Sequence, residues 1–307
     1  MSYIPESRKT SFIIVALVYV VATCIGIDSF LWLMSQFSTY EYLQWVPAEY
    51  QMILAQWLPV ECHTLVALFF ADFMATVFTW AMGVVYKNVS VYDPYWSVAP
   101  PVLLTLYAAL QGPLSDTAVI MLITIFVWAI RLTGNWAYTF KGLLHEDWRY
   151  TKFRPLPWPV FQLINFFGLN LVPTIVVFFA MMPAVRIIDQ QPEVSIYTSI
   201  GTVMCFFAVG IQFVADTTAH EFRRLHPGQV CRVGLWKEGR HPNYFGEILM
   251  WWGIWLQSLS MPIDWTIAGA ILNTLLFLCI SIPLMEARQM KNKPDYAQYR
   301  KETRLLI

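Results

Sequence analysis

Eight apolar segments, separated by short polar stretches, make up most of the chain. Most are close to the roughly 20 residues that an α-helix needs to cross the hydrocarbon core of a bilayer. The third is the shortest. The segments are residues 12–34, 64–86, 96–110, 117–138, 160–182, 196–217, 244–260 and 265–283. This pattern predicts an all-α, polytopic integral membrane protein with about eight transmembrane helices.

The basic residues support the same count. Lys and Arg are concentrated in every second connection, and the connections between these have few or none. Arg8 and Lys9 precede the first segment, and residues 286–307 are again rich in basic side chains. Loops rich in Lys and Arg tend to stay in the cytoplasm. The alternation therefore predicts that both termini are cytoplasmic.

The composition excludes an ordinary soluble domain. Hydrophobic residues make up 57% of the chain and charged residues 13%, against roughly 45–50% and about 25% in typical globular proteins. The net charge is zero, so nothing favours nucleic acid as a partner. Without repeats or linkers, the simplest account is one continuous membrane domain. Its first ninety residues supply two helices and, at residues 38–63, an aromatic loop on the outer side.

Asp93 is the first candidate functional residue. It precedes Pro94 at the start of the third apolar segment, beside three aromatic rings. An Asp at this position can simply cap the helix. Alternatively, its carboxyl group contacts a ligand, and partial burial keeps it protonated and able to donate a hydrogen bond. Earlier in the sequence, Asp28 and Asp72 lie inside apolar segments, where each either packs against a polar partner or has a functional role.

Two apolar segments carry a polar face. One face consists of Arg131, Asn135 and Tyr138, and the other of Gln212, Asp216, His220 and Arg223. The spacings of three and four residues place each set on one side of a helix. Such an Arg needs an anionic partner unless its side chain reaches the membrane surface. The second face is expected to line a polar cavity or to bind another polar helix.

Residues 238–247, Glu-Gly-Arg-His-Pro-Asn-Tyr-Phe-Gly-Glu, lead directly into the seventh apolar segment. The start of a helix offers free N–H groups and a positive dipole end, which suit an anionic cofactor. We therefore expect this stretch to form the floor of a cofactor site. The sequence has no dinucleotide-binding fingerprint, Gly-rich phosphate loop, zinc signature or serine nucleophile elbow. We expect no metal.

These motifs resemble the steroid 5α-reductase superfamily, especially its bacterial branch of uncharacterised integral membrane proteins, over residues 91–307. The matching marks are the Asp216…Arg223 helix, Gly234-Leu-Trp236, Arg240-His-Pro-Asn-Tyr-Phe-Gly-Glu247 with Trp251, Pro283-Leu-Met-Glu-Ala-Arg288 with Tyr296-Ala-Gln-Tyr299, Asp93-Pro-Tyr-Trp96-Ser and Glu146-Asp-Trp-Arg149-Tyr150.

The resemblance implies NADPH-dependent reduction of a carbon–carbon double bond conjugated to a ketone, in a steroid-like or other lipid, at a bacterial inner membrane. The residues that would contact the cofactor are Asp216, Arg223, Asn243, Tyr244, Glu247, Trp251 and Arg288. Family members also use a lipid-binding acid, with a Tyr on the following helix. Asp93 is the counterpart of the acid and the expected catalytic residue, but no Tyr stands at residues 128–131.

Two other functions stay open. Membrane isoprenylcysteine methyltransferases, which use S-adenosylmethionine, share an Arg-His-Pro-x-Tyr-x-Gly stretch that resembles residues 240–246. Asn243 and the Gly246-Glu247 pair favour the reductases instead. A lipid-binding protein or transporter with a polar cavity is the non-enzymatic alternative, although a transporter more often shows internal repeats.

Overall fold

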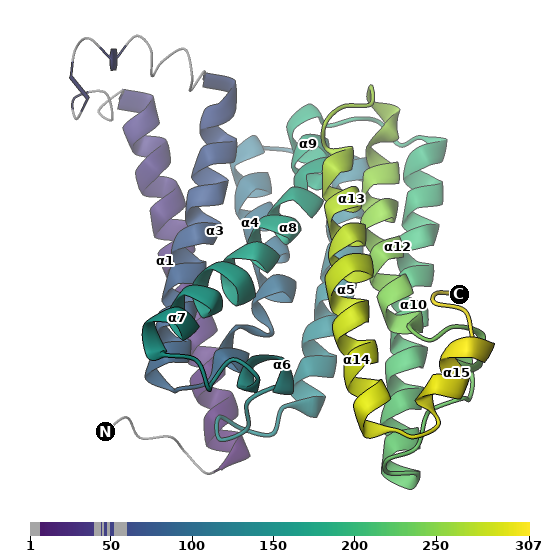
Figure 1. Ribbon diagram of the computed structural model, residues 1–307. Helices are drawn as coiled ribbons and strands as arrows, with labels where there is room; N and C mark the ends of the chain where they lie inside the picture. The colour runs from purple at the N-terminus through teal and green to yellow at the C-terminus, as the bar shows by residue number, and fades with distance from the viewer. Residues whose placement is uncertain (1–6, 40–43, 45, 48–49, 52–59) are drawn as a thin grey trace. The chain divides into compact units, whose positions relative to one another are not determined.

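The computed structural model is mainly helical in its described part (Figure 1), which comprises residues 7–39, 44, 46–47, 50–51 and 60–307 and has no strand beyond one isolated bridge between Gly239 and Arg304. Most of the predicted outer loop at residues 38–63 lies outside these residues. Six helical segments among the described residues are long and apolar enough to cross a membrane. They are Arg8–Thr39, Cys62–Val85, Asp116–Thr139, Trp158–Gln190, Ile196–Leu225 and Ile267–Asn292. The prediction of an all-α, multi-pass integral membrane protein is confirmed.

The elements in chain order are α1 (Arg8–Thr39), α3 (Val60–Val85), η2 (Val89–Tyr92), α4 (Tyr95–Gln111), α5 (Asp116–Thr139), α6 (Trp148–Thr151), α7 (Trp158–Leu163), η3 (Ile164–Leu171), α8 (Val172–Ala180), α9 (Met182–Gln190), α10 (Ile196–Leu225), α11 (Leu235–Glu238), α12 (Pro242–Gln257), η4 (Ser258–Ser260), α13 (Ile267–Leu276), η5 (Phe277–Ser281), α14 (Ile282–Asn292) and α15 (Tyr296–Glu302). The two remaining predicted segments form α4 and α12, with 17 and 16 residues. The count of eight spans and the cytoplasmic termini stay predictions.

Contacts divide the chain into two compact units. Unit 1 comprises Met1–Leu106 and Trp136–Ile175, and unit 2 comprises Tyr107–Asn135 and Val176–Ile307. In unit 1, α1 packs along α3. Two hydrogen bonds join the loop that contains η2 to the loop before α6. The Asn88 side-chain amide donates to the Leu143 carbonyl at 2.8 Å, and Glu146 accepts from the Val89 N–H at 2.8 Å.

Unit 2 is organised around the close packing of α10 on α12. A Cβ at Gly246 would lie 2.8 Å from the Ala208 carbonyl oxygen, and one at Gly253 would lie 2.5 Å from the Cys205 sulfur. Only glycine permits this approach. At its other end α10 begins with a capping box, in which Ser195 and Thr198 satisfy each other's backbone N–H groups.

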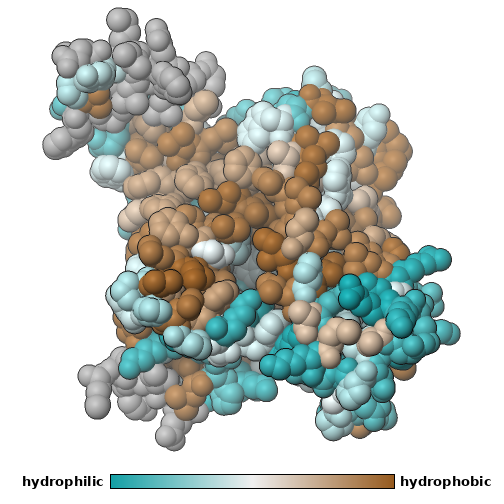
Figure 2. All heavy atoms as spheres, viewed as in Figure 1, coloured by the Kyte–Doolittle hydropathy of each residue, from teal (hydrophilic) through white to brown (hydrophobic). Residues whose placement is uncertain are grey.

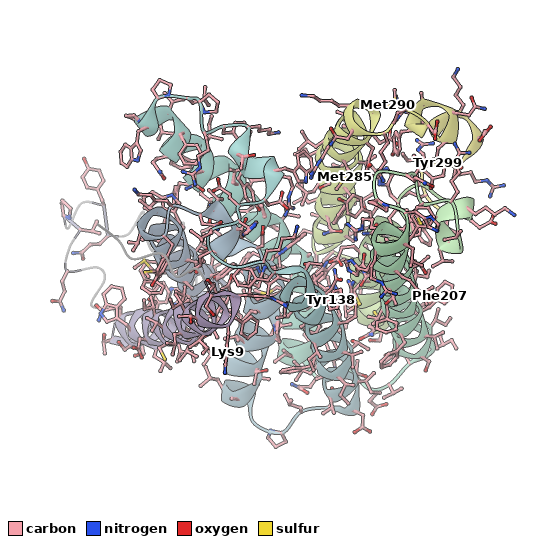
Figure 3. The ribbon with its side chains drawn as sticks, turned by 90° about the horizontal axis from the view of Figure 1, so that it is seen from below. Lys9, Tyr138, Phe207, Met285, Met290 and Tyr299 are labelled. Carbon is pink, nitrogen blue, oxygen red and sulfur yellow. The ribbon has the colours of Figure 1, made fainter. Side chains whose placement is uncertain are left out.

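The outward faces of unit 2 are apolar along the helices and polar at one end. Phe207, which points outward from α10 in Figure 3, is 62% exposed, as expected for a side chain in contact with lipid. Hydrophilic residues gather instead over α15 and the adjoining end of α14 (Figure 2). This distribution agrees with the concentration of charge that the sequence places after residue 286.

Gly269, on α13, tests a second close contact of unit 2, that of α13 with α8. A Cβ there would lie 2.0 Å from the Phe179 carbonyl oxygen, so Gly269→Ala should lower the free energy of unfolding of the detergent-solubilised protein by about 1–3 kcal/mol. The matched control is Gly210→Ala, on the exposed side of α10, where an added Cβ meets nothing within 4 Å. Thermal unfolding followed by circular dichroism would measure both. Equal melting temperatures for the two variants would contradict the packing.

Candidate functional site

The polar faces of α5 and α10 meet in unit 2. Arg131 Nη1 lies 2.8 Å from Asp216 Oδ2, and its Nη2 donates to Gln212 Oε1. The two charged side chains are largely buried, with 9% of Arg131 and 15% of Asp216 exposed. One turn further on, His220 Nε2 and Asn135 Oδ1 are 2.8 Å apart. The expectation that Arg131 needs an anionic partner is confirmed, and the partner is Asp216.

Glu247 lies deeper in the same unit, on α12, and is buried. Its carboxylate accepts N–H donors from three side chains: Trp128 Nε1 at 3.0 Å, Gln212 Nε2 at 2.9 Å and Trp251 Nε1 at 3.2 Å. The indole rings of Trp128 and Trp251 also pack edge to face, with centroids 5.0 Å apart. A buried carboxylate is tolerated only when hydrogen-bonded, and these donors meet that requirement.

Asn243 joins the start of α12 to this arrangement. Its Nδ2 donates to Asp216 Oδ1 at 3.1 Å, and its Oδ1 accepts from the Tyr244 backbone N–H at 3.0 Å. Pro242 occupies the first turn of α12, where its missing N–H costs nothing. The first turn of α12 is thus bound to the ion pair. We call this network the polar cluster: Trp128, Arg131, Gln212, Asp216, Asn243, Glu247 and Trp251.

Four of the seven predicted cofactor residues, Asp216, Asn243, Glu247 and Trp251, belong to the polar cluster. The other three lie in the same unit. Arg223 Nη2 is 2.8 Å from His220 Nδ1, and its Nε donates to the Ala219 carbonyl. The Tyr244 ring is half-buried and lies parallel to the ring of His241, with centroids 5.4 Å apart. Arg288 is half-buried on α14.

Arg223 has a second cation nearby. Burial lowers the pKa of Lys293 below its usual value, and the positive charge of Arg223 lowers it further. In the described part of the chain, neither side chain forms an ion pair with a carboxylate. Cations without a counter-charge favour an anion that can receive charge-assisted hydrogen bonds.

Asp93 belongs to unit 1 and has its own partners there. Its Oδ1 accepts from the Tyr150 hydroxyl and lies 3.3 Å from Arg149 Nη2. Arg149 also pairs with Asp147, at 2.8 Å from its Nε. Burial raises the pKa of the Asp93 carboxyl to about 6, against the lowering effects of Arg149 and Tyr150. A pKa of about 6 keeps a protonated fraction available near neutral pH.

A small pocket lies between α1, α3 and α4 within unit 1. Its lining is mostly small and aliphatic, and its polar groups include Asp72 and Tyr95. The Tyr95 hydroxyl donates to Asp72 Oδ1 at 2.7 Å, and Asp72 is buried. The sequence marks Asp72 as an acid inside an apolar segment. Nothing in the sequence identifies Tyr95, which lies 23 positions away, as its partner.

The fold and these contacts define a class: a multi-pass, all-α membrane protein with a buried polar cluster among its helices. The chain belongs to the family described as "Protein of unknown function (DUF1295)", whose model matches residues 79–303. The match includes Asp93 and all the predicted cofactor residues. No curated protein and no solved structure matches the chain.

The buried ion pair can be tested by a double-mutant cycle. Arg131→Met leaves Asp216 without its cation, so the free energy of unfolding in detergent should fall by about 3 kcal/mol. Asp216→Asn should cost a similar amount, whereas the double variant should cost less than the sum of the two, because no charge is then left unpaired. Arg232→Met breaks an exposed pair with Glu302, which solvent screens, and should cost much less than either buried change. Additive single effects would contradict direct pairing.

Proposed function

We propose that this protein is a membrane-embedded, NADPH-dependent reductase. Its reaction would reduce a carbon–carbon double bond conjugated to a ketone in a steroid-like or other lipid. The observation that carries the proposal is the environment of Glu247, a buried carboxylate beside a buried Arg131–Asp216 pair inside an apolar membrane unit. Polar groups at such positions are costly and are typically kept for function.

The polar cluster supports the choice of cofactor. A carboxylate offers about four acceptor positions, and the side chains of Trp128, Gln212 and Trp251 supply three N–H donors to Glu247. The acceptor position that remains on the Glu247 carboxylate suits the carboxamide N–H of a nicotinamide. Arg223, Lys293 and the N-terminus of α12 provide positive charge for phosphate groups. The protein would thus hold both the uncharged ring and the anionic end of the cofactor.

NADPH would supply the hydride, which adds to the β-carbon of the conjugated ketone. Negative charge then develops on the ketone oxygen, and a hydrogen-bond donor directed at this oxygen is typically worth about 3 kcal/mol. The α-carbon takes up one proton to complete the reduction. The protein's own part is to orient the lipid, stabilise this charge and exclude water.

Two acids are candidates for stabilising that charge. Asp93, the residue expected from the sequence, is held by Arg149 and Tyr150. Asp72 and Tyr95, an acid and a tyrosine on the helices α3 and α4, form the second candidate, which their hydrogen bond suggests rather than the family resemblance. Their pocket is lined mainly by small apolar residues, which suits the hydrocarbon skeleton of a lipid.

The methyltransferase alternative rests on the Arg-His-Pro stretch at residues 240–242. Arg240 and His241 both contact Glu286 on α14, at 2.7 Å and 3.3 Å. These contacts give the two side chains a role within the unit that requires no S-adenosylmethionine. The Arg-His-Pro stretch therefore does not by itself require the methyltransferase alternative.

Nucleotide binding tests the proposal directly. NADPH should stabilise the purified protein against thermal unfolding, by about 2.7 kcal/mol at a hundredfold excess over Kd. S-adenosylmethionine should have no effect, and NADH, which lacks the 2′-phosphate, should act more weakly. Asp216→Ala and Glu247→Ala should each weaken the shift, while Glu193→Ala, which removes an exposed acid outside the polar cluster, should not. Stabilisation by S-adenosylmethionine alone would contradict the reductase proposal and support the methyltransferase alternative.

Turnover distinguishes the two acids. Asp93→Asn and Asp72→Asn should leave NADPH affinity nearly intact, and the variant that removes the working acid should reduce turnover of an enone lipid by about 100-fold. If Asp93 is that acid, the wild-type rate should fall as pH rises through about 6, where its carboxyl loses the proton. Steady-state rates between pH 5 and 8 would show this. Undiminished rates in both variants would remove both residues from the mechanism.

A further inference from the structure

The stretch immediately before α12 is held by hydrogen bonds to residues near the end of the chain. The Tyr299 hydroxyl, on α15, lies within hydrogen-bond distance of two backbone carbonyls, those of Trp236 and Gly239. The Trp236 indole in turn donates to the Ala215 carbonyl of α10 at 2.8 Å. The connection that leads into α12 is therefore held by α15 on one side and by α10 on the other.

Arg240 makes a second set of hydrogen bonds to the end of the chain. Its backbone N–H donates to the Arg304 carbonyl at 2.9 Å, and its Nη1 donates to the carbonyls of Arg300, at 2.9 Å, and Thr303. Residues 303–307, which we call the strap, thus run beside the connection. Their approach is close, because a Cβ at Gly239 would lie 3.0 Å from the backbone N of Ile307.

Glu286 lies where these contacts converge. Its buried carboxylate receives three basic side chains: Arg240 Nε at 2.7 Å, His241 Nε2 at 3.3 Å and Arg300 Nε at 3.0 Å. Buried ion pairs of this kind often contribute little net stability, because desolvation offsets the attraction, and some of them serve structural specificity instead. Glu286 fixes the position of the residues that lead into α12 relative to α14 and α15.

Arg240 and His241 adjoin the polar cluster. His241 stacks on the ring of Tyr244, and Asn243, two residues after His241, donates to Asp216. A shift of Arg240 and His241 would therefore move the first turn of α12. Since Asn243 and Glu247 are on this helix, their positions depend on the contacts of Glu286.

We propose that Glu286 and the strap are positioning elements of the nucleotide site. Through Arg240 and His241 they hold the first turn of α12 where Asn243 can bind the cofactor. This inference rests on the proposed function, because it assumes that the polar cluster binds NADPH. It assigns to residues 303–307 a part in nucleotide affinity, although none of them belongs to the polar cluster.

The experiment compares NADPH affinity across matched variants of the full-length protein in detergent, by titration. Glu286→Gln, which keeps the shape and removes the charge, should weaken binding about tenfold, or about 1.4 kcal/mol. Deletion of residues 304–307 should weaken it in the same direction, and Glu286→Asp should recover part of the loss. The control is Glu302→Gln, which changes an exposed carboxylate of α15 that pairs with Arg232 rather than Arg240. It should leave the affinity within about twofold of wild type.

A double-mutant cycle separates positioning from general loosening of the fold. If Glu286 acts through Asn243, Glu286→Gln should cost little further affinity once Asn243→Ala is present, whereas independent effects would add. Wild-type affinity in both Glu286→Gln and the strap deletion would overturn this inference and leave the proposed function standing. Failure of the wild-type protein to bind NADPH would overturn both. If Glu286→Gln does not fold, the NADPH affinity of the strap deletion alone tests this inference.

Discussion

The ion pair between Arg131 and Asp216 is the interaction on which the arrangement of the polar cluster depends. It joins α5 to α10 at 2.8 Å inside a largely apolar unit. In such surroundings either charge alone would be costly, so the two helices are bound to one relative position. Asp216 also accepts from Asn243 and therefore fixes the first turn of α12. The same ion pair therefore connects three helices, α5, α10 and α12, at the candidate site.

The polar cluster shows how an apolar protein can accommodate a buried carboxylate. Glu247 is supplied with N–H donors by two indoles and one amide, all from side chains that otherwise pack against the helices around them. Close packing of α10 on α12, which depends on glycine at residues 246 and 253, brings the Gln212 amide within reach, whereas Trp251 shares α12 with Glu247 and Trp128 comes from α5. The same small residues that allow the helices to approach therefore determine the geometry around the acid.

Much of this arrangement follows from the sequence, within definite limits. Spacings of three and four residues place Gln212 and Asp216 on one helix face, and the cost of a buried charge requires a partner for Arg131. Spacing says nothing, however, about which helices become neighbours. The contact of Trp128 with Glu247 joins residues 119 positions apart, and the Tyr95–Asp72 bond and the Glu286 contacts likewise join residues far apart in the sequence. These pairings become visible only in the folded chain.

The central claim, that this protein is a hydride-transferring reductase, is tested most directly by isotope transfer. The purified protein would be incubated with NADPH carrying deuterium at the transferable C4 position and with a panel of enone lipids, and the products analysed by mass spectrometry. The account predicts a saturated ketone with one deuterium atom on its β-carbon. A saturated product without deuterium, or no reduction of any enone at nucleotide concentrations that saturate the protein, would contradict it.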